Sequence, residues 1–161
     1  MGTIIYKSPN EKIGDILLSA QDGFITELYF QGGITTPESL RESEPSPQDA
    51  QVLHKLTQEL DAYFAGALRE FTVPLNPRGT DFRKTVWAAL QTIPYGETIS
   101  YKELAIRINN PKAIRAVGGA NHHNPISIII PCHRVIGANG KLVGYGGGMD
   151  AKEYLLNLEK Q

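Results

Sequence analysis

The sequence of 161 residues contains a single cysteine, Cys132, which excludes an intramolecular disulfide and fits a reducing compartment. Its four histidines come without the paired cysteines of a zinc site, and no apolar stretch approaches the length that spans a bilayer. The N-terminus also lacks the basic region and apolar core of a signal peptide. We therefore expect no metal, no cofactor, no membrane partner and a cytoplasmic protein.

The net charge of -1 conceals an asymmetry between the two halves of the chain. Residues 1–77 carry 5 basic and 11 acidic side chains, a net charge of -6, whereas residues 78–161 carry 11 and 6, a net charge of +5. A basic half indicates a polyanionic partner, and an acidic half would limit non-specific binding to it. Chance clustering of surface charge is the alternative.

The first half predicts a small antiparallel sheet covered by a helix. Three short runs are rich in β-branched, aromatic and other apolar residues and predict strands, at residues 3–7, 16–20 and 24–30. Asp22 and Gly23 stand between the last two runs and favour a hairpin. Apolar side chains then recur at helical spacing over residues 48–64, which predicts an amphipathic helix.

Two stretches of this region predict loops. Residues 31–47 lack periodicity and contain glycine and proline among polar residues. Residues 71–80 hold two prolines and a glycine between patterned segments, which is typical of a linker. We therefore expect two domains, residues 1–77 and 78–161. With a mostly helical second domain, the chain is predicted to be an α+β protein.

Signals for helix starts recur through the second half. Asp81 is expected to cap a helix with Trp87 in the core, and Asp150 to cap a final helix with Glu159 in its last turn. Between them, a capping box of Ser100 and Glu103 starts a helix at about Tyr101.

That helix is expected to end at a pair of asparagines and to be followed at once by another. Asn110 before Pro111 predicts a second helix that ends near Val117, at a pair of glycines. Two short helices across a tight turn resemble a helix-turn-helix, whose second helix lies against a DNA groove. Helical hairpins without a nucleic-acid role are at least as common.

The cysteine stands in the run 128–136, whose β-branched residues stop at Pro131 and lead to Cys132 next to His133. This pattern predicts a nucleophile at the end of a buried strand. An inert buried cysteine is the alternative. The glycine-rich residues 137–148 lack the Gly-Lys-Ser/Thr ending of a phosphate-binding loop, so we expect a flap beside the thiol.

Six motifs of the second half, in this order and at this spacing, resemble the O6-alkylguanine-DNA alkyltransferases, also called methylated-DNA–protein-cysteine methyltransferases. They occupy residues 99–105, 110–119, 124–125, 130–135, 144–147 and 152–156. The first half resembles this family only in layout. The resemblance implies a ribonuclease H-like N-terminal domain and a helix-turn-helix in the C-terminal domain.

The resemblance also implies an activity. The family transfers an alkyl group from O6-alkylguanine, and from O4-alkylthymine, in double-stranded DNA to its own cysteine, here Cys132, irreversibly and once per molecule. A monomer without a cofactor is expected. By position, His133 is the base that reaches the thiol through a water, Glu159 orients His133, and the Tyr101 hydroxyl assists the departing guanine.

Further roles follow from the same resemblance. Arg115 matches the arginine finger that fills the place of a flipped-out nucleotide, and Asn124 matches the asparagine that braces the helix-turn-helix against the active-site turn. The remaining DNA-binding positions are expected to be Tyr101, Lys102, Asn110 and Ala113. The walls of the alkylguanine pocket are expected to be Val135, Tyr145, Gly146 and Ser127.

The sequence departs from the family pattern at three points. Gly146 stands where some members have serine, Ser127 stands where some have proline, and the N-terminal cysteines that hold zinc in some eukaryotic members are lacking. Two rival functions stay open beside alkyl transfer. One is a non-catalytic sensor of alkylated guanine, against which the presence of Cys132 argues, and the other is a cysteine hydrolase, for which an adjacent nucleophile and base are unusual.

Overall fold

The computed structural model describes residues 1–137 and 148–160. Its first half contains a three-stranded antiparallel sheet of β1 (Gly2–Lys7), β2 (Asp15–Gln21) and β3 (Phe24–Phe30), in this order. Asp22 and Gly23 form the turn between β2 and β3, and both have positive φ (54° and 83°), as a type I′ hairpin turn requires. The hairpin expected from the sequence is confirmed.

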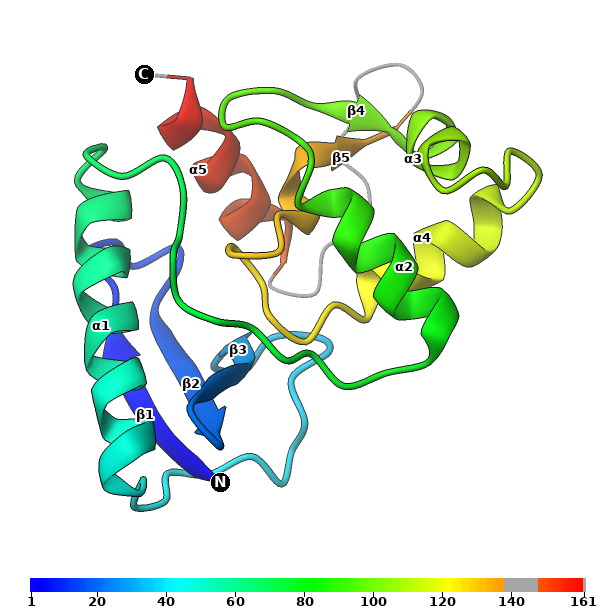
Figure 1. Cartoon of the computed structure of the whole chain (residues 1–161). Coiled ribbons are helices and arrows are strands. Elements are labelled where there is room, and N and C mark those ends of the chain that lie inside the picture. The colour runs from blue at the N-terminus through cyan, green and yellow to red at the C-terminus, as the bar shows by residue number, and fades with distance from the viewer. Residues whose placement is uncertain (138–147, 161) are drawn as a thin grey trace.

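Helix α1 (Pro47–Phe64) covers one face of this sheet (Figure 1). Ser46 caps it by accepting a hydrogen bond from the backbone amide of Asp49 at 3.2 Å. The apolar stripe that includes Leu53, Leu56 and Leu60 is buried. Burying each such side chain contributes about 1.5–3 kcal/mol to stability. The predicted layout of sheet plus helix is therefore confirmed.

Strand β3 also pairs with two segments outside this sheet. Ile25 forms a parallel bridge with Leu75, and Leu28 forms one with Ile126, far along the chain. The amide of Leu28 donates a hydrogen bond at 2.8 Å to the residue before Ile126. The stretch 71–80, expected to be a linker, is thus partly hydrogen-bonded to the sheet, and the buried side chains of both halves belong to one continuous core.

The second half is mostly helical (Figure 1). Its elements are α2 (Asp81–Leu90), β4 (Ile99–Ser100), α3 (Tyr101–Arg107), α4 (Ile114–His122), the 3-10 turn η1 (Cys132–Arg134), β5 (Val135–Ile136) and α5 (Met149–Glu159). None of the helices in the described ranges is both long and apolar enough to cross a bilayer.

The short strands β4 and β5 determine where the cysteine lies. They pair in parallel, with Ile99 opposite Val135. Helix α3 begins directly after β4, and the turn that holds Cys132 ends directly before β5. The pairing therefore brings the start of α3 next to the cysteine.

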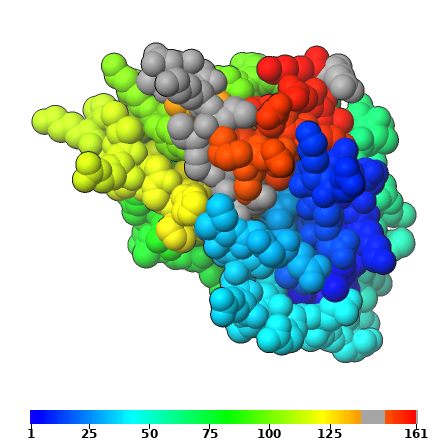
Figure 2. Space-filling model, turned by 180° about the vertical axis from the view of Figure 1, so that it is seen from behind, coloured from blue at the N-terminus to red at the C-terminus, as the bar shows by residue number. Residues whose placement is uncertain are grey.

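Helices α3 and α4 form the expected helix-turn-helix, with α2 packed against both. Gly118 of α4 faces the ring of Tyr101, to which a Cβ at this position would approach within 3.9 Å. The buried indole of Trp87 donates a hydrogen bond to the carbonyl of Ala120 at 2.8 Å and fixes α2 to α4. Helix α4 projects at one side of the molecule, away from β1 (Figure 2).

Two predicted helix caps are wrong by one or two residues. Thr80, not Asp81, caps α2, because its extended backbone lets the hydroxyl accept from the amide of Arg83 at 3.2 Å. Gly148, not Asp150, precedes α5. Both aspartates lie in the first turn instead, where a negative charge favourably meets the positive end of the helix dipole.

The prediction for α4 is also wrong. The amide of Ala113 donates to the carbonyl of Asn110 at 3.0 Å, and this turn takes up the residues expected to open the helix. Helix α4 therefore begins at Ile114 without a side-chain cap. It also continues through the glycine pair to His122, because neither glycine has the positive φ with which a glycine ends a helix.

Candidate active site

Cys132 opens the turn η1, and its side chain is nearly buried, at 3% exposed. The strand predicted to lead into it is absent from the described residues. Ile128 instead has a φ of 71°, a left-handed conformation that costs a non-glycine residue roughly 1–2 kcal/mol, and the amide of Ile130 turns back onto the carbonyl of Ile126 at 3.0 Å. Both Ile128 and Ile130 are buried in the core, which offsets this cost.

Two asparagines hold the chain around the cysteine. The Nδ2 of Asn124 donates to the carbonyl of Ile130 at 2.7 Å, and its Oδ1 accepts from the amide of Ile126 at 2.9 Å. The Nδ2 of Asn121, on α4, donates to the carbonyl of Cys132 at 3.5 Å. Asn124 thus spans the turn that precedes the cysteine, and Asn121, which sequence reasoning missed, links this turn to the helix-turn-helix.

His133 is fully buried and contacts Glu159 of α5, with 2.7 Å between Nε2 and Oε2. Burial lowers the pKa of His133, and although Glu159 raises it, the charges of Arg134 and Lys152 lower it further. The imidazole is therefore neutral at pH 7, with its proton on Nε2 facing the carboxylate. Among the described residues no group hydrogen-bonds Nδ1, which remains an acceptor.

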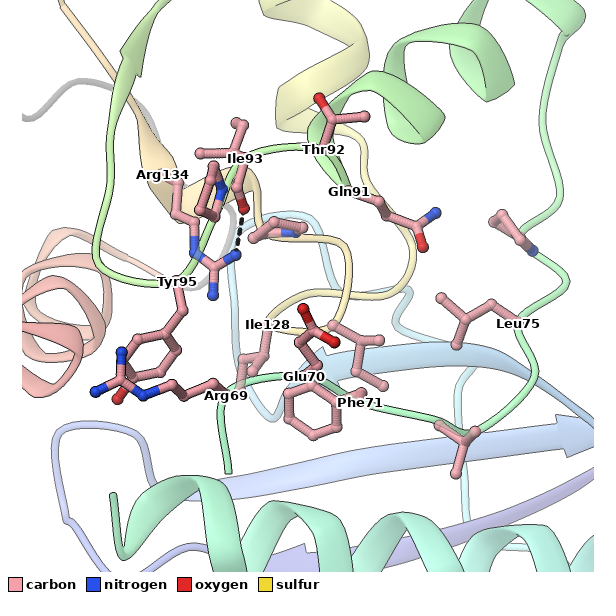
Figure 3. Close-up of a pocket in the computed structure, with 15 residues that line it drawn as sticks. Arg69, Glu70, Phe71, Leu75, Gln91, Thr92, Ile93, Tyr95, Ile128 and Arg134 are labelled. Atoms are coloured by element: carbon pink, nitrogen blue, oxygen red, sulfur yellow. Dashed lines mark hydrogen bonds between the residues drawn. The ribbon is translucent and has the colours of Figure 1, made fainter. Parts of the chain in front are cut away.

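Arg134, from the same turn as His133, also contacts the carboxylate of Glu159. Its Nε donates to Oε1 of Glu159 at 2.8 Å and its Nη2 to Oε2 at 3.0 Å, while Nη1 donates to the carbonyl of Ile93 at 2.7 Å (Figure 3). Burial alone would raise the pKa of Glu159, but His133 and Arg134 outweigh it and hold this pKa far below its usual range. Glu159 is therefore ionised and held from several sides.

A tyrosine from the first half reaches the same carboxylate. Tyr63 is buried near the end of α1, and its hydroxyl donates to Oε2 of Glu159 at 2.5 Å. In the sequence Tyr63 only continues the apolar stripe of the helix predicted over residues 48–64, because its phenol ring satisfies the helical periodicity. No local signal could reveal a partner 96 positions along the chain.

The charge of Cys132 affects the pKa values of two further side chains, Lys152 and Tyr101. Lys152 of α5 is fully buried and donates to the carbonyl of Val135 at 2.7 Å. Burial lowers its pKa to about 8, although the charge of Cys132 acts in the opposite direction. Burial raises the pKa of Tyr101, a hydrogen bond with Asn121 lowers it, and the charge of Cys132 raises it again. Cys132 therefore lies near both an ammonium and a phenol.

The predicted DNA-binding residues divide between surface and site. Lys102, Asn110 and Arg115 are exposed on or between α3 and α4, and Ala113 is half-buried. Tyr101 begins α3 and faces inward toward Asn121. The predicted positions therefore place two cations, Lys102 and Arg115, and the amide of Asn110 on the surface of the helix-turn-helix.

The structure describes two of the four predicted pocket residues. Val135 and Ser127 are buried, the first in β5 and the second with its backbone amide bonded to Leu28 at 3.1 Å. Tyr145 and Gly146 lie outside the described residues.

A cavity of about 670 Å³ opens between the two halves of the chain (Figure 3). Its lining includes Arg69, Phe71, Tyr95, Pro131 and Arg134, but neither the thiol nor His133. The guanidinium carbons of both arginines lie over the Tyr95 ring, at 4.9 and 5.8 Å from its centre. Through Arg134 this cavity adjoins the hydrogen-bonded group of Glu159, His133, Arg134 and Tyr63, which we call the Glu159 cluster.

Both halves of the chain match a protein family. Residues 4–77 match the ribonuclease-like domain of 6-O-methylguanine DNA methyltransferase, and residues 81–161 match its DNA-binding domain. A methylated-DNA–protein-cysteine methyltransferase of Methanosarcina acetivorans is 51% identical over 158 residues, covering 96% of each chain. One of Mycobacterium tuberculosis is 50% identical over 157 residues, covering 98% of this chain and 93% of its own.

Solved structures agree with this match over the whole chain. The Mycobacterium tuberculosis protein OGT in complex with DNA has a TM-score of 0.84 at 49% identity, covering 98% of this chain and 91% of its own. An O6-methylguanine-DNA methyltransferase from Pyrococcus kodakaraensis has a TM-score of 0.62 at 26% identity, covering 99% and 98%. The arrangement of sheet, helix-turn-helix and cysteine turn is thus similar to theirs.

Proposed function

Because this chain belongs to the methylated-DNA–protein-cysteine methyltransferases, which repair DNA by direct reversal of damage, we propose that it transfers the alkyl group of O6-alkylguanine to Sγ of Cys132. The observation that carries this assignment is the hydrogen-bonded series from Glu159 to His133, directly beside the cysteine. It unites a nucleophile, a neutral base and a group that orients the base.

Alkyl transfer requires ionisation of the thiol and then displacement at the alkyl carbon. The Nδ1 of His133, through a water, accepts the proton of the thiol, and Glu159 stabilises the imidazolium that forms. The thiolate attacks the alkyl carbon, the bond from this carbon to O6 breaks, and its electron pair remains on guanine. The hydroxyl of Tyr101 donates toward a ring nitrogen of the departing base, a contribution of roughly 10²–10⁴-fold for general acid catalysis. The thioether that results is not converted back to the thiol, so each molecule reacts once.

Lys152 of α5 also favours ionisation of the thiol. Its ammonium lies close enough for mutual electrostatic influence with Cys132, and a nearby cation lowers the pKa of a thiol. It is held by the carbonyl of Val135, so its charge has a fixed place. Ionised Lys152 and neutral His133 therefore favour the thiolate together.

This arrangement predicts how the transfer rate depends on pH. The rate should fall on the acid side only below the ordinary range of histidine, because the pKa of His133 is lowered. On the alkaline side it should fall above about pH 8, where Lys152 loses its charge. Single-turnover rates measured across pH give both falling parts of the rate profile, the acid limb and the alkaline limb. In Lys152→Met the rate at neutral pH should drop and the alkaline limb should vanish; an alkaline limb unchanged in this variant would contradict the role of Lys152.

On the same grounds we propose the substrate, the assembly state and the location of the protein. The substrate is double-stranded DNA, from which the damaged nucleotide is flipped at a cost of a few kcal/mol, because a base edge in a duplex does not reach a nearly buried thiol. O4-alkylthymine is a further substrate. The protein acts as a monomer of two domains, divided after residue 77, in the cytoplasm, where a lone reactive thiol stays reduced.

The finger role proposed for Arg115 has a direct test. Arg115→Ala should slow repair of O6-methylguanine in duplex DNA by about tenfold or more, because the unstacked place would lie empty, a penalty of a few kcal/mol. Reaction with the free base O6-benzylguanine should keep its rate. Lys84→Ala, which removes an exposed cation from α2, controls for charge. Equal slowing on duplex and free base would remove the finger role.

Stoichiometry separates the proposal from its rivals. Limiting protein mixed with excess duplex containing O6-methylguanine should repair one lesion per protein molecule and then stop, and the protein should gain one methyl group. Binding without repair would instead indicate a damage sensor. Continued turnover, or cleavage of ester substrates, would indicate a hydrolase.

A further inference from the structure

The first half of the chain contributes one polar contact to the Glu159 cluster, and it comes from Tyr63. The hydroxyl joins α1 to α5 at 2.5 Å, across the proposed domain boundary. We propose that Tyr63 is a positioning residue for alkyl transfer, acting through Glu159 on His133. This inference rests on the proposed function, and it makes the docking of the N-terminal domain part of the activation of the thiol.

The direction of the hydrogen bond is fixed. Burial first, and the charge of Glu159 second, raise the pKa of Tyr63 well above 10, so the phenol stays protonated. Glu159 stays ionised, because His133 and Arg134 keep its pKa low. The phenol is therefore always the donor, and short bonds from a hydroxyl to a carboxylate are among the strong ones.

The ring of Tyr63 is held in place by its neighbours. Its centre lies 5.5 Å from that of Phe64 with a steep interplanar angle of 71°, 5.4 Å from that of Phe71, and 6.2 Å from that of Tyr95. Tyr95 itself lies under the guanidinium of Arg134. Because the ring is fully buried in this cluster, its hydroxyl cannot swing away from the carboxylate.

The hydrogen bond from Tyr63 reduces the negative charge that the carboxylate of Glu159 presents to His133. Oε2 of Glu159 accepts from Tyr63, from Nε2 of His133 and from Nη2 of Arg134. A donor on Oε2 draws negative charge away from the imidazole, so Tyr63 lowers the pKa of His133. The charged and titratable groups that face or adjoin His133 are Glu159 and Lys152 from α5, Arg134 and Cys132 from its own turn, and Tyr63 only through the carboxylate.

Tyr63→Phe keeps the ring and removes the hydroxyl. We expect the transfer rate at pH 7 to fall about tenfold, the scale of one hydrogen bond to a charged group. The acid limb of the rate profile should move to higher pH, because the carboxylate then holds the imidazolium more strongly. Titration of His133 by NMR, without DNA, should show its pKa raised in the same sense.

The matched control is Tyr6→Phe. Tyr6 is also buried, and its hydroxyl also donates to a carboxylate, Oδ1 of Asp61 at 2.7 Å, but it joins β1 to α1 away from the cysteine. This variant should lose stability as Tyr63→Phe does and leave the rate, its acid limb and the titration of His133 unchanged. A purely structural role for Tyr63 would make the two variants alike, which would overturn the proposal.

A second substitution keeps the test decisive if Tyr63→Phe fails to fold. Incorporating 3-fluorotyrosine at position 63 retains shape and hydroxyl but makes the phenol a stronger donor, so the pKa of His133 should move down. An unmoved titration would refute the inference even if the wild-type protein transfers methyl groups normally. Failure of the wild-type protein to transfer any methyl group would refute the proposed function instead.

Discussion

Replacing Cys132 with serine is expected to abolish alkyl transfer and to leave binding of damaged DNA intact. A free thiol ionises near pH 8.5, whereas a hydroxyl does so far above the range in which His133 and Lys152 work. Serine also keeps the size of the side chain and the backbone bond from residue 132 to Ile130, at 2.8 Å, so the turn should survive. Intact-mass spectrometry after incubation with excess O6-methylguanine duplex measures the transfer.

Binding of the same duplex, measured by fluorescence anisotropy, provides the control. Cys132→Ser should bind it within about twofold of the wild-type protein before reaction, because the cations of the helix-turn-helix are untouched. A methyl group found on the Cys132→Ser protein would contradict the account. So would disappearance of O6-methylguanine from the DNA in its presence.

The second large effect is expected from Glu159→Gln. The amide keeps the shape of the carboxylate but places a donor against Tyr63, His133 or Arg134, all of which donate to it. It also leaves the buried guanidinium without its counter-charge. Breaking a buried ion pair in this way costs about 3–5 kcal/mol of unfolding free energy. Without its orienting partner His133 should also lose most of its effect as a base, about 10²-fold or more in rate.

Glu103→Gln is the matched control for this substitution. Glu103 pairs with Arg107 at 3.4 Å, but both side chains are partly exposed and lie one turn apart on α3. Removing such a pair changes stability by about 0.5 kcal/mol or less. Denaturant unfolding of both variants should therefore separate them clearly. Equal stability of the two would mean that the Glu159 cluster contributes nothing beyond a surface pair.

Local sequence signals predicted the elements well where one short segment carries the whole signal. The Asp22-Gly23 hairpin and the cap at Ser100 depend on residues within four positions of each other, and both are present. The predictions that Asp81 and Asp150 cap their helices were wrong, because an acidic residue is favoured in the first turn of a helix as well as at the cap.

The run before Cys132 misled for a different reason. Isoleucine-rich sequence favours a strand, but a strand needs a partner over its whole length, and residue 126 alone bridges to β3. Burial of Ile128 and Ile130 in the core then outweighs the strain of a positive φ. Tertiary packing overrode the local preference.

The sequence predicted the site best for the residues to which the family resemblance assigned roles. The structure brings Cys132, His133 and Glu159 together, with Tyr101 and Asn124 close by. The contacts of Tyr63 and Lys152 were not predicted, because the partner of a buried phenol or ammonium is fixed only by the folded chain. Through Tyr63 the N-terminal half reaches the carboxylate that contacts His133.

The most direct test is to locate the transferred group. The wild-type protein is treated with duplex DNA whose O6-methylguanine bears an isotopically labelled methyl group, then digested and sequenced by tandem mass spectrometry. We expect one labelled methyl group per molecule, on Sγ of Cys132, with guanine restored in the DNA. Label on another residue, or label released to solvent while Cys132 stays unmodified, would contradict transfer to this cysteine.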